Sequence, residues 1–142
     1  MTRRFWAGAA AFLPGMFTAC RKPAAIPPDL FANTAAGGWQ LTSVRDLPAS
    51  ESRDPVPRGS IDRIVAASYQ GPGKLEARVY ALSAPEVAMD VARRWRPSAD
   101  TVFFNRGPFF VVVKWQSADR QLLKEFIADL EKRLAAASRG AR

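Results

Sequence analysis

Histidine is absent from the 142-residue chain, and cysteine occurs only once. Zinc sites built from His and Cys, Ser-His-Asp triads and Cys-His pairs each need a residue that is missing here. A single cysteine also excludes an internal disulfide. The sequence therefore predicts no metal site, no cofactor and no catalytic residue, and any acid–base chemistry would need paired carboxylates or a lysine with a shifted pKa.

Acidic residues are also scarce, because 13 Asp and Glu face 21 Lys and Arg and give a net charge of +8. The composition is otherwise that of a globular chain, with 48% apolar and 24% charged residues, which excludes a disordered or collagen-like protein. A chain of this length is enough for one small domain.

A long hydrophobic run is missing too. The uncharged stretch over residues 5–17 is 13 residues long and contains Pro14 and Gly15, whereas a membrane-spanning helix needs about 20 apolar residues. Arg3 and Arg4 precede it, in the order typical of an export signal. We therefore predict that residues 1–19 are a signal peptide.

The end of this run, Phe17-Thr18-Ala19-Cys20, resembles the lipobox of bacterial lipoproteins. The resemblance implies cleavage before Cys20, attachment of acyl chains such as palmitate to it, and a place in the bacterial cell envelope on the exported face of the inner or outer membrane. A stray thiol in an ordinary secreted leader is the alternative. Residues 2–6 also resemble a twin-arginine signal, so two export routes stay open.

Residues 20–38 contain three prolines and end in a glycine pair, which predicts an acylated cysteine followed by an extended tether. Leu30 and Phe31 are expected to dock on the domain. Arg21 and Lys22 either attract anionic headgroups or only end the apolar run. The folded domain is predicted over residues 39–137, with a flexible tail over 138–142.

Within that domain, alternation predicts strands at 39–44, 61–69, 74–82, 101–105 and 109–115. Helical periods predict a helix capped by Ser83 and ending near Arg96, and a second capped by Ser117 that fades after residue 134. We expect an α+β fold, an antiparallel sheet of about five strands with two helices packed on one face, in the order β-β-β-α-β-β-α. The loop over 45–60 is either functional or mobile.

Residues 75–80, Leu-Glu-Ala-Arg-Val-Tyr, and 83–88, Ser-Ala-Pro-Glu-Val-Ala, carry a second resemblance. They are similar to a family of uncharacterised exported bacterial proteins in which a V-x-V-Y strand leads into an S-P-E-x-A helix. The similarity implies a fold and no activity.

Four arginines form the candidate anion-binding site, Arg93, Arg94 and Arg96 at the end of the first helix and Arg106 in a nearby turn. Cations in a last helical turn also complement the helix dipole and need no ligand. The phenylalanines at 103, 104, 109 and 110, interleaved with Arg106 and Lys114, predict either a stacking platform or core packing.

Carboxylates such as Asp62, Glu76 and Asp100 show no spacing that pairs them in a cleft, and Glu86 and Asp90 lie on the exposed face of the first helix. The favoured function is a non-catalytic envelope binding or interaction module. An accessory subunit of an envelope assembly is second, and a carboxylate hydrolase third. Removing Arg3 and Arg4 leaves a charge of +6, so we expect an anionic envelope polymer or another envelope protein as partner, and not nucleic acid.

Overall fold

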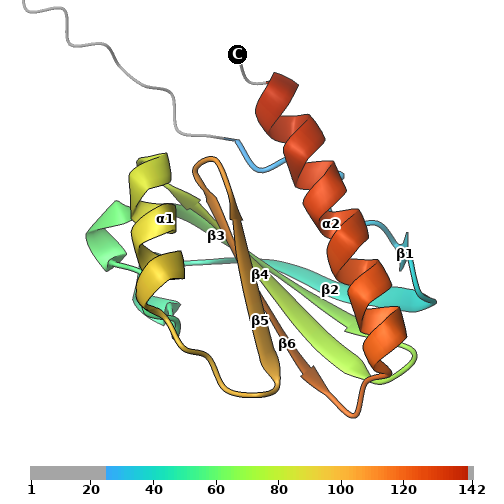
Figure 1. Cartoon of the computed structure of the whole chain (residues 1–142). Coiled ribbons are helices and arrows are strands. Elements are labelled where there is room, and N and C mark those ends of the chain that lie inside the picture. Colours follow the sequence, from blue (N-terminus) through green and yellow to red (C-terminus); the bar gives the residue numbers. More distant parts are fainter. Residues whose placement is uncertain (1–24, 141–142) are drawn as a thin grey trace, which may run out of the picture.

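Six antiparallel strands form one curled sheet in the order β1-β2-β3-β4-β6-β5 in this computed structural model, which describes residues 25–140 (Figure 1). The strands are β1 (Thr34–Ala35), β2 (Trp39–Leu47), β3 (Ile61–Gln70), β4 (Lys74–Leu82), β5 (Thr101–Arg106) and β6 (Phe109–Gln116). The helices are α1 (Pro85–Arg94) and α2 (Arg120–Gly140), and two short 3-10 turns, Ala49–Glu51 and Arg58–Ser60, lie between β2 and β3. The predicted α+β class is confirmed.

The sheet has one strand more than expected. The short strand β1 lies within the predicted tether, where Thr34 pairs with Gln40 of β2. Gly37 and Gly38 make the reversal between the two strands with positive φ angles, and a Cβ on Gly37 would come within 2.6 Å of the Leu122 carbonyl oxygen. Glycine is therefore required at this turn.

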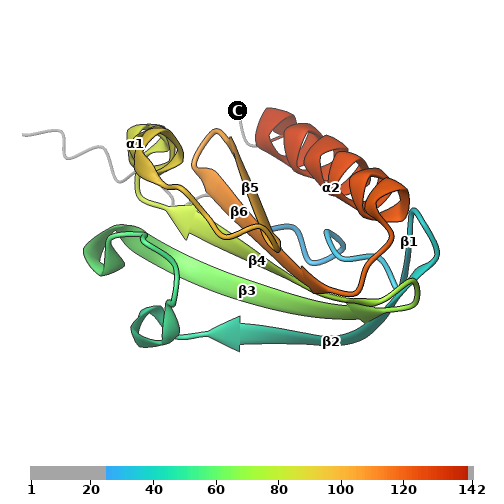
Figure 2. The ribbon, with the colours of Figure 1, turned by 60° about the horizontal axis from the view of Figure 1, so that its bottom comes forward.

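The two helices pack on opposite faces of the sheet, so the predicted placement on one face is wrong. Along β4, Val79 belongs to the cluster under α2 and its neighbour Tyr80 to the cluster under α1. The same alternation separates Val111 from Phe110 in β6. Figure 2 shows the β5–β6 hairpin running between the helices. Strands that are apolar on both faces need cover on both, which is the physical reason for the difference.

The α2 side holds the larger core. Phe126 lies edge-on to Tyr69 and Trp39, with ring centroids 4.9 and 6.3 Å apart. The Trp39 indole Nε1 donates a hydrogen bond of 3.1 Å to the Leu122 carbonyl, which satisfies its buried N–H. The remaining buried helix residues are Leu123, Leu130 and Leu134. This packing ties the start of the sheet to the last helix.

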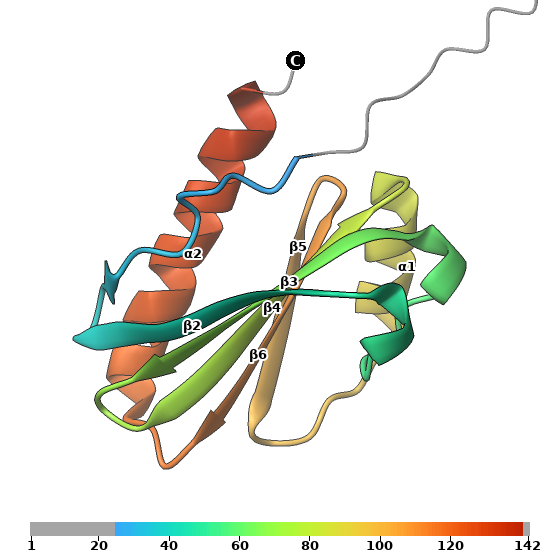
Figure 3. The same cartoon turned by 180° about the vertical axis from the view of Figure 1, so that it is seen from behind.

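The segment before β1 also packs on this side, although the sequence predicted an extended tether. Ile26, Leu30 and Ala35 are buried in the same cluster, and the Tyr69 hydroxyl donates to the Ala32 carbonyl at 2.9 Å. Figure 3 shows this segment crossing α2 beside β2. We call residues 26–35 the strap. Docking of Leu30 was expected, whereas docking of the whole strap was not.

The α1 side is covered by α1 and by the loop between β2 and β3. Val91 of α1 and Val56 of the loop are both buried there. Trp95 follows α1 and stacks on Phe103 of β5 at 5.1 Å. The long loop is therefore part of the core on this side.

The helix ends differ from expectation. Ala84, not Ser83, occupies the N-cap of α1 without a side-chain hydrogen bond, and Pro85 in the first position keeps the backbone helical. For α2, the cap is Asp119, whose Oδ1 accepts the Leu122 amide at 3.0 Å, while Ser117 sits in a turn with φ of 51°. The helix then continues to Gly140, past the predicted fading point.

None of the helices within residues 25–140 is both long and apolar enough to cross a membrane. The leader and Cys20, by contrast, lie outside the described residues.

Candidate functional site

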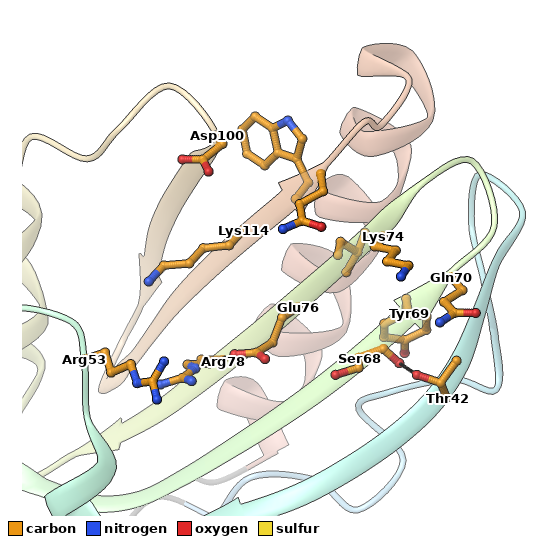
Figure 4. A pocket seen from close by; sticks show the side chains of 13 residues that line it. Thr42, Arg53, Ser68, Tyr69, Gln70, Lys74, Glu76, Arg78, Asp100 and Lys114 are labelled. Carbon is orange, nitrogen blue, oxygen red and sulfur yellow. Dashed lines mark hydrogen bonds and ion pairs between the residues drawn. The ribbon is translucent and has the colours of Figure 1, made fainter.

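The part of the α1-side face that α1 leaves open forms a polar groove of about 490 Å³. Strands β2, β3, β4 and β6 form its floor. Arg53 of the β2–β3 loop and Asp100, just before β5, stand at its rim (Figure 4). Its lining consists of Thr42, Arg53, Ser68, Tyr69, Gln70, Lys74, Leu75, Glu76, Arg78, Asp100, Lys114, Trp115 and Gln116. We call it the sheet groove.

The alternation of β4 explains why the groove is polar. On the α1 side the strand carries Lys74, Glu76 and Arg78 in its first half, followed by Tyr80 and Leu82. Only the second half is covered by α1 and the loop. Charged side chains are more stable in contact with water, so this first half of β4 stays uncovered.

Asp54 of the loop lies beside the groove, on the same face of the sheet as Tyr80 and Lys114, and its side chain is only 1% exposed. Its Oδ2 accepts a hydrogen bond from the Tyr80 hydroxyl, and its Oδ1 lies 3.3 Å from the Lys114 Nζ. Burial, with a contribution from this hydrogen bond, raises the pKa of Tyr80 to about 12. The buried carboxylate is thus held between a neutral hydroxyl and an ammonium group.

Arg78 and Glu76 make a second charged pair on the groove floor. The Arg78 Nε donates to a Glu76 carboxylate oxygen at 2.5 Å. Burial lowers the pKa of Arg78, but the Glu76 hydrogen bond and charge outweigh it, so this pKa lies above its ordinary value. Arg78 Nη1 is buried with no hydrogen-bond partner among the residues that the structure describes. A guanidinium N–H without an acceptor is therefore left at this place.

The groove is positive overall. Its charged lining residues are four cations and two carboxylates: Arg53, Lys74, Arg78 and Lys114, with Glu76 and Asp100. Neither Arg53 nor Lys74 forms an ion pair within residues 25–140, and both are exposed. Figure 4 shows the Arg53 side chain reaching from the loop toward Arg78. The arrangement favours a ligand with an anionic group.

The four arginines of the predicted anion site do not form one cluster. Arg94 pairs with Asp90 at 3.1 Å, and Arg96 donates to the backbone carbonyls of Arg93 and Trp95. Arg106 instead pairs with Glu131 of α2, on the other side of the β5–β6 hairpin. The guanidinium groups of Arg94 and Arg96 thus interact with α1 and the residue that follows it, as expected for cations that end a helix.

The phenylalanines proposed for a stacking platform pack in the core. Phe109 and Phe110 are buried on the α2 and α1 sides respectively. Phe103 stacks against Trp95, and Phe104 lies against the α2-side cluster. Lys114 lines the groove, as does the neighbouring Trp115, which belongs to the same set of aromatic and cationic residues.

The carboxylates form no paired catalytic constellation on the described part of the chain. Glu76 is held by Arg78, Asp54 by Tyr80 and Lys114, and Asp90 by Arg94. No group of three potential metal ligands occurs within residues 25–140 either.

Sequence reasoning missed most of the groove. Two signals were available, the polar first half of β4 and the adjacent Arg53 and Asp54 in a loop too long for a simple connection. Neither signal predicts that Asp54 of this loop contacts Tyr80 and Lys114, because these residues are far apart in the sequence and meet only in the folded chain.

Comparison with protein families, curated proteins and solved structures finds no match for this chain, so the proposals below depend on its own residues.

Proposed function

We propose that this chain is an exported, lipid-anchored envelope protein that acts as a non-catalytic binding module, with the sheet groove as its binding site. The export signal and the lipobox-like Phe17-Thr18-Ala19-Cys20 support the location. The open, charged groove supports the binding role.

The single observation that carries the binding role is the cluster of charged side chains in and beside the groove: Asp54, Glu76, Arg78 and Lys114. Removing a carboxylate such as that of Asp54 from water costs several kcal/mol unless its partners compensate. Well-packed apolar residues could close this face of the sheet at no such cost. A cluster of charges beside an open groove is better explained by recognition than by packing.

The strap supports a position close to the membrane. Only residues 21–25 separate Cys20 from Ile26, which is buried in the core. A fully extended chain spans at most about 3.6 Å per residue, so the first packed residue lies within roughly 20 Å of an acylated Cys20. In this proposal the acyl chains on Cys20 insert into the bilayer and hold the protein at the membrane.

The anchoring is tested by labelling cells with radioactive palmitate. The parent protein is expected to incorporate the label and to fractionate with membranes. Cys20→Ala removes the only thiol and is expected to abolish both. Thr18→Ala is the matched control, because it changes a neighbouring residue and leaves the acylation site intact. Label that persists in Cys20→Ala would exclude this proposal.

An accessory-subunit role is the second candidate, supported by one observation. Beyond Gln40, the outer edge of β2 has no strand partner in the described sheet, and Val44 on it is 48% exposed. Open edges can pair with another chain. Sedimentation of the protein in a detergent extract of the envelope tests this role, since a species of monomer size with no other envelope protein bound would argue against it.

A further inference from the structure

We propose that the sheet groove binds an acidic saccharide, with its carboxylate or phosphate at one end of the groove and its hydroxyl groups at the other. This inference deepens the proposed binding role and rests on it. The side chains at one end of the groove are mainly cationic, and those at the other end are mainly amides and hydroxyl groups.

The acid-binding end lies where the loop meets β4. Arg53 offers an exposed guanidinium with no ion-pair partner among residues 25–140, and Lys114 is 43% exposed. Arg78 is fixed by Glu76, and its buried Nη1 is closed off from the groove, so it contributes positive charge beneath the surface and no direct contact. An oxyanion held by Arg53 and Lys114 would lie beside this charge and receive charge-assisted hydrogen bonds.

Asp54 holds the ammonium group of Lys114 in place beside the groove. Its Oδ1 draws the ammonium group to 3.3 Å without a hydrogen bond of good geometry. The lysine is thereby held over the groove floor with donors to spare. Asp54 is a positioning residue in this scheme and does not contact the ligand.

The hydroxyl-binding end lies at the start of β4. In the strand register Lys74 stands between Gln70 of β3 and Gln116 of β6. Thr42 and Ser68 are adjacent, and the Thr42 hydroxyl already donates to the Ser68 carbonyl. Side-chain amides both donate and accept hydrogen bonds, which suits the hydroxyl groups of a sugar.

The spacing of the two ends fits a short saccharide. Lys74 and Arg78 are four residues apart on one strand, which corresponds to about 13 Å along the groove. A single small anion would occupy only the acid-binding end. A chain of two or three sugar units would reach both.

Isothermal titration of the whole chain, extracted from membranes in detergent, tests the inference with four probes. Trigalacturonate carries carboxylates, mannose 6-phosphate carries a phosphate, and maltotriose is a neutral chain of similar length. Citrate is an acid without a sugar. We expect trigalacturonate, which can reach both ends, to bind at least about tenfold more tightly than maltotriose and citrate. Tighter binding of mannose 6-phosphate, in spite of its single sugar unit, would identify the acid as a phosphate.

Two exposed arginines make a matched pair of variants. Arg53→Gln should weaken binding of the acidic saccharide about tenfold, the loss typical of one charge-assisted contact, whereas Arg93→Gln at the end of α1 should not change it. Gln116→Ala should weaken trigalacturonate and maltotriose by a similar factor. Binding of the acidic probe should also weaken as salt is raised.

The inference is overturned if no acidic saccharide binds, if maltotriose binds equally well, or if Arg53→Gln binds like the parent protein. Any of these results leaves the palmitate experiment unaffected. Failure of lipid labelling, in turn, would reject the anchor without changing the titration. The two proposals can therefore fail separately.

Discussion

At the scale of single residues, both tyrosines of the chain are buried and each uses its hydroxyl. Tyr80 donates to Asp54 beside the groove, and Tyr69 donates to the strap carbonyl of Ala32. Burial is the main reason that the pKa of each is raised to about 12. These hydroxyls report on the two faces of the sheet separately, because one lies on each.

The first prediction concerns alkaline pH. A tyrosine whose pKa rises from about 10 unfolded to about 12 folded stabilises the fold fully below pH 10, and this contribution is lost as the pH rises from 10 to 12. Each two-unit shift corresponds to about 2 to 3 kcal/mol. Absorbance at 295 nm should show no tyrosinate near pH 10 in the folded protein. A step at pH 10 would show that one hydroxyl is exposed.

At the scale of elements, α2 is the helix on which the larger core depends. It buries four large side chains against the sheet and the strap, and Phe126 is only 2% exposed. α1 covers a smaller area and leaves the groove open. Changes in α2 should therefore affect stability, whereas changes at the groove rim should affect binding.

Phe126→Ala should lower the free energy of unfolding by about 3 to 5 kcal/mol, because it leaves a cavity between Trp39 and Tyr69. Met89→Ala on α1 is the control, since Met89 is 44% exposed, and it should change stability by less than about 0.5 kcal/mol. Chemical denaturation measures both. Equal values for the two variants would contradict the packing described for α2.

The cap of α2 gives a separate prediction. Asp119→Ala removes the acceptor for the Gln121 and Leu122 amides and should cost about 0.5 to 2 kcal/mol. Ser117→Gly should be neutral or stabilising, because glycine adopts a φ of 51° without strain. The melting temperatures of the two variants show which residue caps the helix. If Ser117 were the cap, the Asp119 variant would keep the parent melting temperature.

At the scale of the whole molecule, the strap makes the folded unit start before residue 39. Ile26, Leu30 and Ala35 complete the α2-side core. Only five residues, 21–25, separate Cys20 from Ile26 in the sequence. Under the proposed acylation of Cys20, this short separation would place the sheet groove close to the membrane surface.

A chain that begins at Trp39 is predicted to be much less stable than one that begins at Arg21. Ile26 and Leu30 alone contribute about 1.5 to 3 kcal/mol each when fully buried, a large share of the stability of a small domain. Urea denaturation of the two chains measures the difference. Coincident unfolding curves would show that the strap is only a tether.

Periodicity was sufficient to predict most of the fold. The bounds of β4 match the expected 74–82, and β3, β5 and β6 differ by one residue. The prediction failed where tertiary contacts decide, because a Pro-rich strap such as residues 26–35 looks extended until α2 covers it. The site could not be predicted for the same reason. Asp54 and Lys114 are 60 residues apart in the sequence, and nothing in that spacing shows that they form an ion pair.

The central claim is that the anion-binding surface is the sheet groove and not the arginines that end α1. Nuclear magnetic resonance shift mapping with trigalacturonate tests it most directly. We predict that backbone amides of residues 68–78 and 114–116 shift with the ligand, while those of residues 93–96 do not. Shifts confined to residues 93–96 would contradict the claim and assign binding to the end of α1.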